Sequence, residues 1–333
     1  MKQRLESSTT YARAMFNRRT CLATSAALLT NPTVSLADFE FPKHFIGANT
    51  AINGYGLFGA IDLLRDLGFR TIEIQNLVGA PEPTAGKFPG FRWEQADDEF
   101  RDRIKNALID FELITTHLPY QGLEYFGSAG EQARNGVETM ERSLEATAIL
   151  GAKIGVVHPK PGPGMSLAET WPFMIRRFRQ WGDLAKAGGF RLALETGYPT
   201  SVDDFVRLVH EVDHDWVGAA LDVGHQGRFE ELVKKVKPED RGTAEGIKAY
   251  NDLNLELVDR LGTKLIHLHV HDIEPSTWRE HKPLIYGFID YARLIQRLRE
   301  TMYEGVLVFE IGGPAAEMPT YLKDAKRKLE RYI

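Results

Sequence analysis

The chain has 333 residues, of which 43% are apolar and 26% are charged, and its formal net charge at pH 7 is −5. These values are typical of a globular protein with one large domain or two small ones. The negative net charge and the lack of a long Lys/Arg cluster argue against nucleic acid as a partner. Proteins that bind nucleic acid neutralise its phosphates with clustered Lys and Arg side chains. No run approaches the roughly 18 apolar residues that span a bilayer, so no membrane partner is expected.

The first 37 residues predict an export signal. Arg18 and Arg19 precede a mildly apolar stretch, which ends in a Ser-Leu-Ala triplet with small residues at the −3 and −1 positions. These are the parts of a secretory signal, and the paired arginines indicate the twin-arginine kind. We therefore expect residues 1–37 to be a signal peptide and residues 38–333 to form a periplasmic or exported protein. The alternative is an N-terminal extension on a cytoplasmic protein.

Cys21 is the single cysteine of the chain. No intrachain disulfide can form, and cleavage after residue 37 would leave a mature protein without any thiol. Any metal site must therefore use histidine and carboxylate ligands.

From residue 44 onward, short β-rich runs alternate with amphipathic helical stretches. Strands are predicted over His44–Ala51, Arg70–Gln75, Leu113–Leu118, Lys153–His158, Arg191–Glu195, Val217–Asp222, Lys264–His271 and Gly305–Ile311. Helical patterns follow them over Leu57–Leu67, Glu94–Glu112, Glu131–Leu150, Leu167–Ala187, Val202–Val212, Phe229–Leu261, Tyr291–Met302 and Tyr321–Tyr332. Strands that are apolar on both faces and separated by helices form a parallel sheet. Eight such units close most naturally into a single-domain (β/α)8 TIM barrel of the α/β class.

An open, doubly wound sheet is the alternative architecture. Its phosphate-binding fingerprint is matched only by Gly54, Gly56 and Gly59, into which no predicted strand leads directly. Two long connections, Asn76–Trp93 and Gln226–Leu261, follow strand ends and are candidate lids, and Pro238 is expected to split the second one into two helices.

Polar side chains recur at the carboxyl ends of the predicted strands. They are His117, His158, Glu195, Asp222, His225, His269, His271 and Glu310. In a barrel these ends form one ring around a cavity, where buried carboxylates and imidazoles need a compensating partner. A divalent cation is that partner, and a site without thiolates suits Mn²⁺ first, with Mg²⁺, Co²⁺ or Zn²⁺ as alternatives. For His267, His210 and His214 we expect structural roles.

Three motifs resemble the xylose isomerase-like barrel superfamily, specifically its sugar phosphate isomerase/epimerase and ketose 3-epimerase branch, with endonuclease IV as a distant relative. They are Leu221-Asp222-Val223-Gly224-His225, His267-Leu268-His269-Val270-His271-Asp272, and the run from Gly287-Phe288-Ile289-Asp290 to Phe309-Glu310. The resemblance runs from about residue 44 to the end of the chain.

The resemblance implies a set of site residues. Glu195, Asp222, His269 and Glu310 match the four metal ligands of the epimerases, and His225 matches a histidine that contacts substrate there. His117, His158 and His281 match positions that bind additional zinc in endonuclease IV, and here we expect them to contact substrate.

The chain departs from both relatives in the same loop. Arg279 stands where endonuclease IV has a zinc-binding Asp, which argues against a three-zinc cluster. Pro275 stands where the epimerases have a substrate-binding Arg, so Arg279 or Lys160 is expected to bind an acidic group if the substrate carries one.

The predicted function is therefore metal-dependent isomerisation or epimerisation of a small sugar or keto-sugar, with Glu195 and Glu310 transferring the proton next to a carbonyl through an enediolate. A lyase or dehydratase would begin with the same proton abstraction. Less favoured alternatives are an endonuclease IV-like metallo-phosphodiesterase and a sugar-binding barrel without turnover. The sequence leaves the oligomeric state open, a homo-oligomer included.

Overall fold

The computed structural model describes residues 40–42, 45–75, 97–127 and 130–333. The predicted signal peptide, the whole of the predicted lid Asn76–Trp93, and His44 at the start of the first predicted strand lie outside the described residues.

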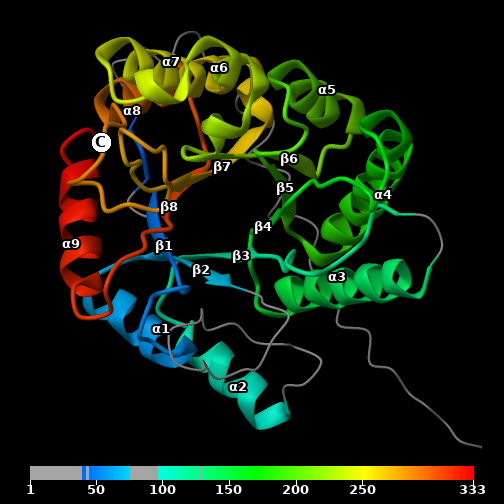
Figure 1. Ribbon diagram of the computed structural model, residues 1–333. Coiled ribbons are helices and arrows are strands. Elements are labelled where there is room, and N and C mark those ends of the chain that lie inside the picture. The colour runs from blue at the N-terminus through cyan, green and yellow to red at the C-terminus, as the bar shows by residue number, and fades with distance from the viewer. Residues whose placement is uncertain (1–39, 43–44, 76–96, 128–129) are drawn as a thin grey trace, which may run out of the picture. The chain divides into compact units, whose positions relative to one another are not determined.

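Eight parallel strands pair in chain order and close into a barrel, as predicted (Figure 1). The strands are β1 (Ile46–Asn49), β2 (Thr71–Gln75), β3 (Leu113–His117), β4 (Ile154–Val157), β5 (Arg191–Glu195), β6 (Val217–Asp222), β7 (Leu265–Val270) and β8 (Val306–Phe309). Pairing of β8 with β1, with Ile46 opposite Leu307, closes the ring. The open-sheet alternative is therefore excluded.

Helices surround the ring of strands (Figure 1). They are α1 (Leu57–Asp66), α2 (Asp98–Ala107), α3 (Glu131–Ile149), α4 (Leu167–Gly188), α5 (Val202–Val212), α6 (Glu230–Lys235), α7 (Ala244–Leu261), α8 (Tyr291–Glu300) and α9 (Met318–Leu329). Short 3₁₀ turns, η4 (His225–Arg228), η5 (Pro238–Asp240) and η6 (Gly262–Lys264), lie in the connections around α6 and α7. No helix of the described chain is long and apolar enough to cross a membrane.

Local sequence signals explain most of the helix boundaries. Ser166 and Glu169 form a reciprocal capping box at the start of α4, and Gly189 ends that helix in the left-handed conformation with φ of 75°. Of the predicted helix over Glu94–Glu112, the described residues form α2 over Asp98–Ala107, and Asp97 caps its first turn by accepting a hydrogen bond from the Phe100 amide.

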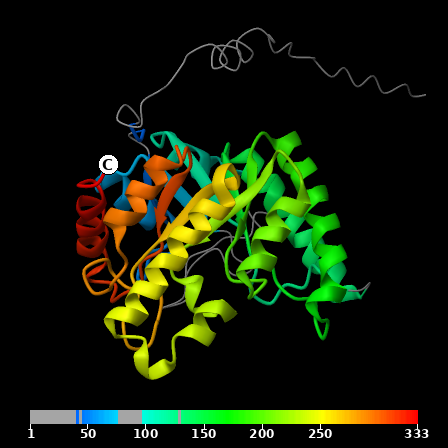
Figure 2. The ribbon, with the colours of Figure 1, turned by 90° about the horizontal axis from the view of Figure 1, so that it is seen from above.

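The connection between β6 and β7 contains two helices, as predicted. The 3₁₀ turn η5 begins at Pro238 and separates α6 from α7. In Figure 2 this segment, in yellow-green and yellow, extends beyond the barrel at one end.

Strands β4 to β8 contribute an apolar cluster to the barrel core. Its buried side chains are Ile154, Val156, Ala193, Ala220, Ile266, Val306 and Val308. Successive side chains of a strand point to opposite faces, so residues two apart share the interior face. Ala193 therefore precedes Glu195, Ala220 precedes Asp222 and Val308 precedes Glu310 on the same inward face. The apolar cluster therefore lies deeper in the barrel than these three carboxylates.

Candidate metal centre and cavity

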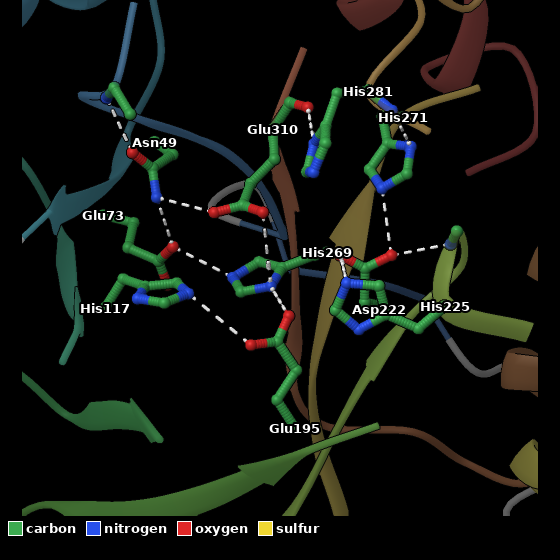
Figure 3. Close-up of polar contacts among 12 residues, drawn as sticks. Asn49, Glu73, His117, Glu195, Asp222, His225, His269, His271, His281 and Glu310 are labelled. Atoms are coloured by element: carbon green, nitrogen blue, oxygen red, sulfur yellow. Dashed lines mark hydrogen bonds and ion pairs between the residues drawn. The ribbon is translucent and has the colours of Figure 1, made fainter. Parts of the chain in front are cut away.

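Four side chains from neighbouring strands converge at the carboxyl end of the barrel (Figure 3). Glu195 ends β5, Asp222 ends β6, His269 lies in β7, and Glu310 directly follows β8. Each offers one ligand atom, and the four atoms all lie within 4.8 Å of one another. The structure thus brings together the four residues that the sequence predicted as ligands, and their donor set could hold a divalent cation.

His269 lies at the centre of this group and is fully buried. Its Nδ1 is 2.7 Å from Glu195 Oε1 and 3.7 Å from Glu310 Oε2. Its Nε2 is 2.9 Å from Oε1 of a third carboxylate, Glu73. Burial lowers the pKa of His269, but the charges of Glu310, Glu73 and Glu195 outweigh burial and raise that pKa well above its ordinary value.

We call Glu195, Asp222, His269 and Glu310 the quartet. Two buried carboxylate oxygens of this quartet lack a hydrogen bond from any described residue. They are Glu195 Oε2 and Asp222 Oδ2. Oε2 of Glu195 is 2.7 Å from His158 Nε2, but that contact does not have hydrogen-bond geometry. An unsatisfied buried carboxylate oxygen costs free energy, and a cation bound among the four side chains would satisfy both atoms. The quartet therefore fits a divalent metal.

The other oxygen of Asp222 is firmly held. Oδ1 accepts a hydrogen bond of 2.6 Å from the Gly224 amide and lies 2.9 Å from His271 Nε2. Burial raises the pKa of Asp222, but the charges of His225 and His271 and the His271 hydrogen bond lower it further than burial raises it. Asp222 is thus an ionised carboxylate with one oxygen fixed and the other without a hydrogen bond from the described residues.

His117 and His158 face Glu195 from β3 and from the end of β4. Their Nε2 atoms are 3.3 Å apart, and His117 Nε2 is 3.5 Å from Glu195 Oε2. These three residues form a second group whose ligand atoms lie within 4.8 Å of one another. Tyr120 packs against His158 with ring centroids 4.0 Å apart.

A cavity of about 400 Å³ opens above the quartet. It is lined by most of the predicted site residues, namely His117, His158, Lys160, Glu195, His225, His281 and Glu310, whereas Asp222 and His269 are buried beneath it. His225 Nδ1 lies 2.5 Å from the Thr196 carbonyl and its Nε2 lies 3.5 Å from Asp222 Oδ2. His281 Nδ1 lies 2.9 Å from the Glu310 carbonyl.

The structure does not place Arg279 at this cavity, contrary to the sequence prediction. Its side chain is 69% exposed, and its Nε is 3.5 Å from Glu274. Among the described residues, Arg228 of η4 is the arginine that lines the cavity, and it pairs with Glu280. Lys160 does line the cavity, but its Nζ donates to the Tyr120 and Leu123 carbonyls and so holds the loop after β3.

The sequence interpretation missed Glu73 and Asn49. Glu73 lies in β2 and is fully buried in the barrel interior. Asn49, at the end of β1, donates from Nδ2 to Glu73 Oε1 at 2.8 Å and to Glu310 Oε1 at 3.0 Å. A glutamate between two isoleucines of a buried strand was the available signal, because such a carboxylate requires partners.

The chain is similar to several known proteins. Residues 61–332 match the family model described as Xylose isomerase-like TIM barrel. The chain is 21% identical over 269 residues to L-ribulose-5-phosphate 3-epimerase UlaE of Escherichia coli (strain K12), which covers 78% of this chain and 83% of that protein. Among solved structures, D-psicose 3-epimerase with D-tagatose from Clostridium cellulolyticum has a TM-score of 0.61 at 16% identity, covering 86% and 98% of the two chains. The 3-keto-D-glucoside 4-epimerase YcjR from E. coli has a TM-score of 0.59 at 19% identity, covering 86% and 99%. These two structures share the fold.

Proposed function

The chain belongs to the xylose isomerase-like TIM-barrel family, and we propose that it is a metal-dependent epimerase or isomerase of a small sugar or keto-sugar. One observation carries the proposal. Glu195, Asp222, His269 and Glu310 converge within 4.8 Å beneath a cavity of about 400 Å³, which has room for a monosaccharide or a small glycoside. The relatives named as epimerases of ketoses and keto-glycosides support the same class of reaction.

The four residues would hold one divalent cation, with Mn²⁺ proposed first because carboxylate and imidazole donors suit it. When bound, the cation supplies Lewis-acid polarisation of a carbonyl group, which makes the neighbouring C–H more acidic. The remaining steps belong to side chains of this chain.

Glu195 and Glu310 are the proposed proton-transfer pair. Both line the cavity, from β5 and from the end of β8, with the two strands β6 and β7 between them. One glutamate removes the proton from one face of the carbon next to the carbonyl, and the other returns a proton on the opposite face. Asn49 holds Glu310 through the hydrogen bond to Oε1, which leaves Oε2 to face the site.

The histidines of the cavity wall are proposed to hold substrate oxygens. The Nε2 atoms of His158 and His225 lie beside Glu195 and Asp222, respectively, so an oxygen bound next to the quartet comes within their reach. His117 and His281 complete the polar wall. Tyr120 gives the cavity an aromatic surface against which a sugar ring can pack.

The test is a panel of ketoses and keto-glycosides incubated with the full-length protein and Mn²⁺ in D₂O, followed by sugar NMR. We expect one substrate to form an epimer or isomer that carries deuterium at the reacting carbon. Loss of water from the sugar would instead identify a lyase that uses the same proton abstraction. No conversion of any panel member, with metal occupancy confirmed, would contradict the proposal.

A metallo-phosphodiesterase is the second candidate, and the His117–His158–Glu195 group is the observation that favours it, because a second ion there would share Glu195 with the quartet. Elemental analysis separates the two candidates. About one ion per chain supports the epimerase, and more than one, together with cleavage of a DNA that contains an abasic site, supports the phosphodiesterase.

We also propose that residues 1–37 are removed during export to the periplasm. The proposal rests on the paired arginines, the apolar stretch and the small residues before position 38. Intact mass of protein from a host with twin-arginine export should correspond to a chain that begins near Asp38. A full-length chain retained in the cytoplasm would contradict it.

A further inference from the structure

Glu73 is a carboxylate on the floor of the metal centre that touches neither the cavity nor the quartet's open oxygens. It is fully buried, as are the neighbouring imidazoles of His267 and His269. A buried carboxylate is strongly destabilising unless it is paired and hydrogen-bonded. The groups around Glu73 therefore have to explain how its charge is stabilised in the barrel interior.

Every neighbour of the Glu73 oxygens is a hydrogen-bond donor or an imidazole. Oε1 accepts from Asn49 Nδ2 at 2.8 Å and lies 2.9 Å from His269 Nε2. Oε2 accepts from Thr115 Oγ1 at 3.0 Å and lies 3.0 Å from His267 Nε2. The Asn49 amide is oriented independently, because its Oδ1 accepts from the Ala51 amide at 2.6 Å and so turns Nδ2 toward Glu73. Glu73 thus acts as an ionised acceptor.

This arrangement determines which nitrogen of His269 faces the other three residues of the quartet. Both ring nitrogens lie beside a carboxylate, Nε2 at 2.9 Å from Glu73 Oε1 and Nδ1 at 2.7 Å from Glu195 Oε1. Only Nδ1 is on the side of Glu195 and Glu310, so it is the nitrogen that would offer a lone pair to a cation, while Nε2 keeps donating to Glu73, which can only accept. A carboxylate behind a histidine ligand fixes the ring's tautomer and orientation and raises its basicity.

We propose that Glu73 is a positioning residue that fixes His269 as an Nδ1 metal ligand. The inference rests on the proposed function, since it takes the quartet as the metal site. Asn49, which the Ala51 amide orients, shares the two protons of its Nδ2 among Glu73, Gln75 and Glu310. Glu73 itself supports one of the four residues directly, namely His269.

The variants Glu73→Gln and Thr115→Val separate this role from simple packing. Glu73→Gln keeps the side-chain volume but removes the charge that His269 faces. Thr115→Val removes a donor to the same carboxylate and leaves the His269 contact in place. We expect Glu73→Gln to weaken Mn²⁺ binding, measured by competition with a chelating dye, by about 10–100-fold. Thr115→Val should stay within about threefold of the wild-type Kd.

A second measurement observes the protons of the His269 ring directly. In ¹⁵N-histidine NMR spectra of the wild-type protein loaded with diamagnetic Zn²⁺, His269 should show a protonated Nε2 and an unprotonated Nδ1. In Glu73→Gln the Nε2 proton should move upfield, because the hydrogen bond to a carboxylate is lost.

The outcomes are distinguishable. A wild-type protein that binds no metal would overturn the proposed function and this inference together. Normal metal binding with Nε2 unprotonated in the wild type, or a Glu73→Gln Kd equal to that of Thr115→Val, would overturn the positioning role alone. A lower melting temperature without a change in Kd would mean that Glu73 only stabilises the barrel, and would overturn it as well.

Discussion

His271 Nε2 lies 2.9 Å from Asp222 Oδ1, although the two residues are 49 positions apart in the sequence. The other ring nitrogen, Nδ1, accepts a hydrogen bond of 2.9 Å from the main-chain amide of His281, which adopts a left-handed φ of 61°. The loop after β7 is thus tied through one imidazole to a carboxylate of the candidate metal centre. His271 occupies one oxygen of Asp222 and leaves Oδ2 open toward the quartet.

We predict that His271→Ala weakens Mn²⁺ binding by about tenfold, because Asp222 then loses a donor that orients it. The Kd is measured by chelator competition at constant pH. His210→Ala is the control, because His210 lies on the exposed surface of α5, where its ring contacts the Arg260 carbonyl. Equal Kd values for the two variants would show that His271 does not support the metal site.

Removal of metal should destabilise the protein. The empty site contains the buried carboxylates of Glu195 and Asp222, each with an unsatisfied oxygen, and a bound cation stabilises only the folded state. At about 100 times its Kd, a ligand adds about 2.7 kcal/mol to the free energy of unfolding, which for a chain of this size raises the melting temperature by about 5 °C. EDTA should therefore lower the melting temperature, and Mn²⁺ should restore it. An unchanged melting curve after complete metal removal would contradict this prediction.

The metal-free protein should lose stability at alkaline pH through His117. Burial lowers the pKa of His117, but Glu195 and the charges of Glu310 and Glu73 raise it further, to about 9. The folded pKa exceeds the ordinary value of 6.5, so this stabilisation is complete below pH 6.5 and is lost as the pH rises through 9. Its full size is up to about 3 kcal/mol for this buried group.

The check is a series of melting curves of the EDTA-treated protein between pH 6 and pH 10. We expect the wild-type melting temperature to fall across this range more steeply than that of His117→Asn, which has no titrating imidazole. Parallel curves for the two proteins would show that His117 carries no such proton.

The barrel and the quartet could be predicted from the sequence because strand periodicity fixes which residues share the interior face. Glu195 and Asp222 each end an apolar run, and the ends of parallel strands meet at one side of a barrel. The convergence of these side chains therefore followed from the order of strands and helices alone. The Pro238 break was predictable for a similar local reason, since proline removes a backbone donor and commonly breaks or kinks a helix, although α4 accommodates Pro172.

The role of Glu73 and the position of Arg279 could not be predicted in this way. The role of Glu73 depends on a contact with His269, 196 residues away, which the alternation pattern of β2 does not contain. The position of Arg279 depends on the path of the loop after β7, where Trp278 and His281 adopt left-handed backbone angles that no turn motif predicts. Arg228 lines the cavity instead, because η4 begins at His225, only three residues after the end of β6 at Asp222.

The central claim is that Glu195 and Glu310 transfer a proton beside a metal held by the quartet. The most direct test measures turnover and deuterium incorporation from D₂O by Glu195→Gln and Glu310→Gln, with the substrate that the sugar panel identifies. Each change keeps one oxygen for the metal and removes the basic oxygen, so metal should stay bound while turnover falls by about 10²–10⁴-fold. Glu256→Gln, on the exposed surface of α7, is the matched control and should turn over at the wild-type rate. One of the two variants should still exchange the substrate's C–H for deuterium without forming product, because the remaining glutamate can return a proton to its own face. Near-wild-type turnover in either variant, with metal occupancy confirmed, would contradict the account.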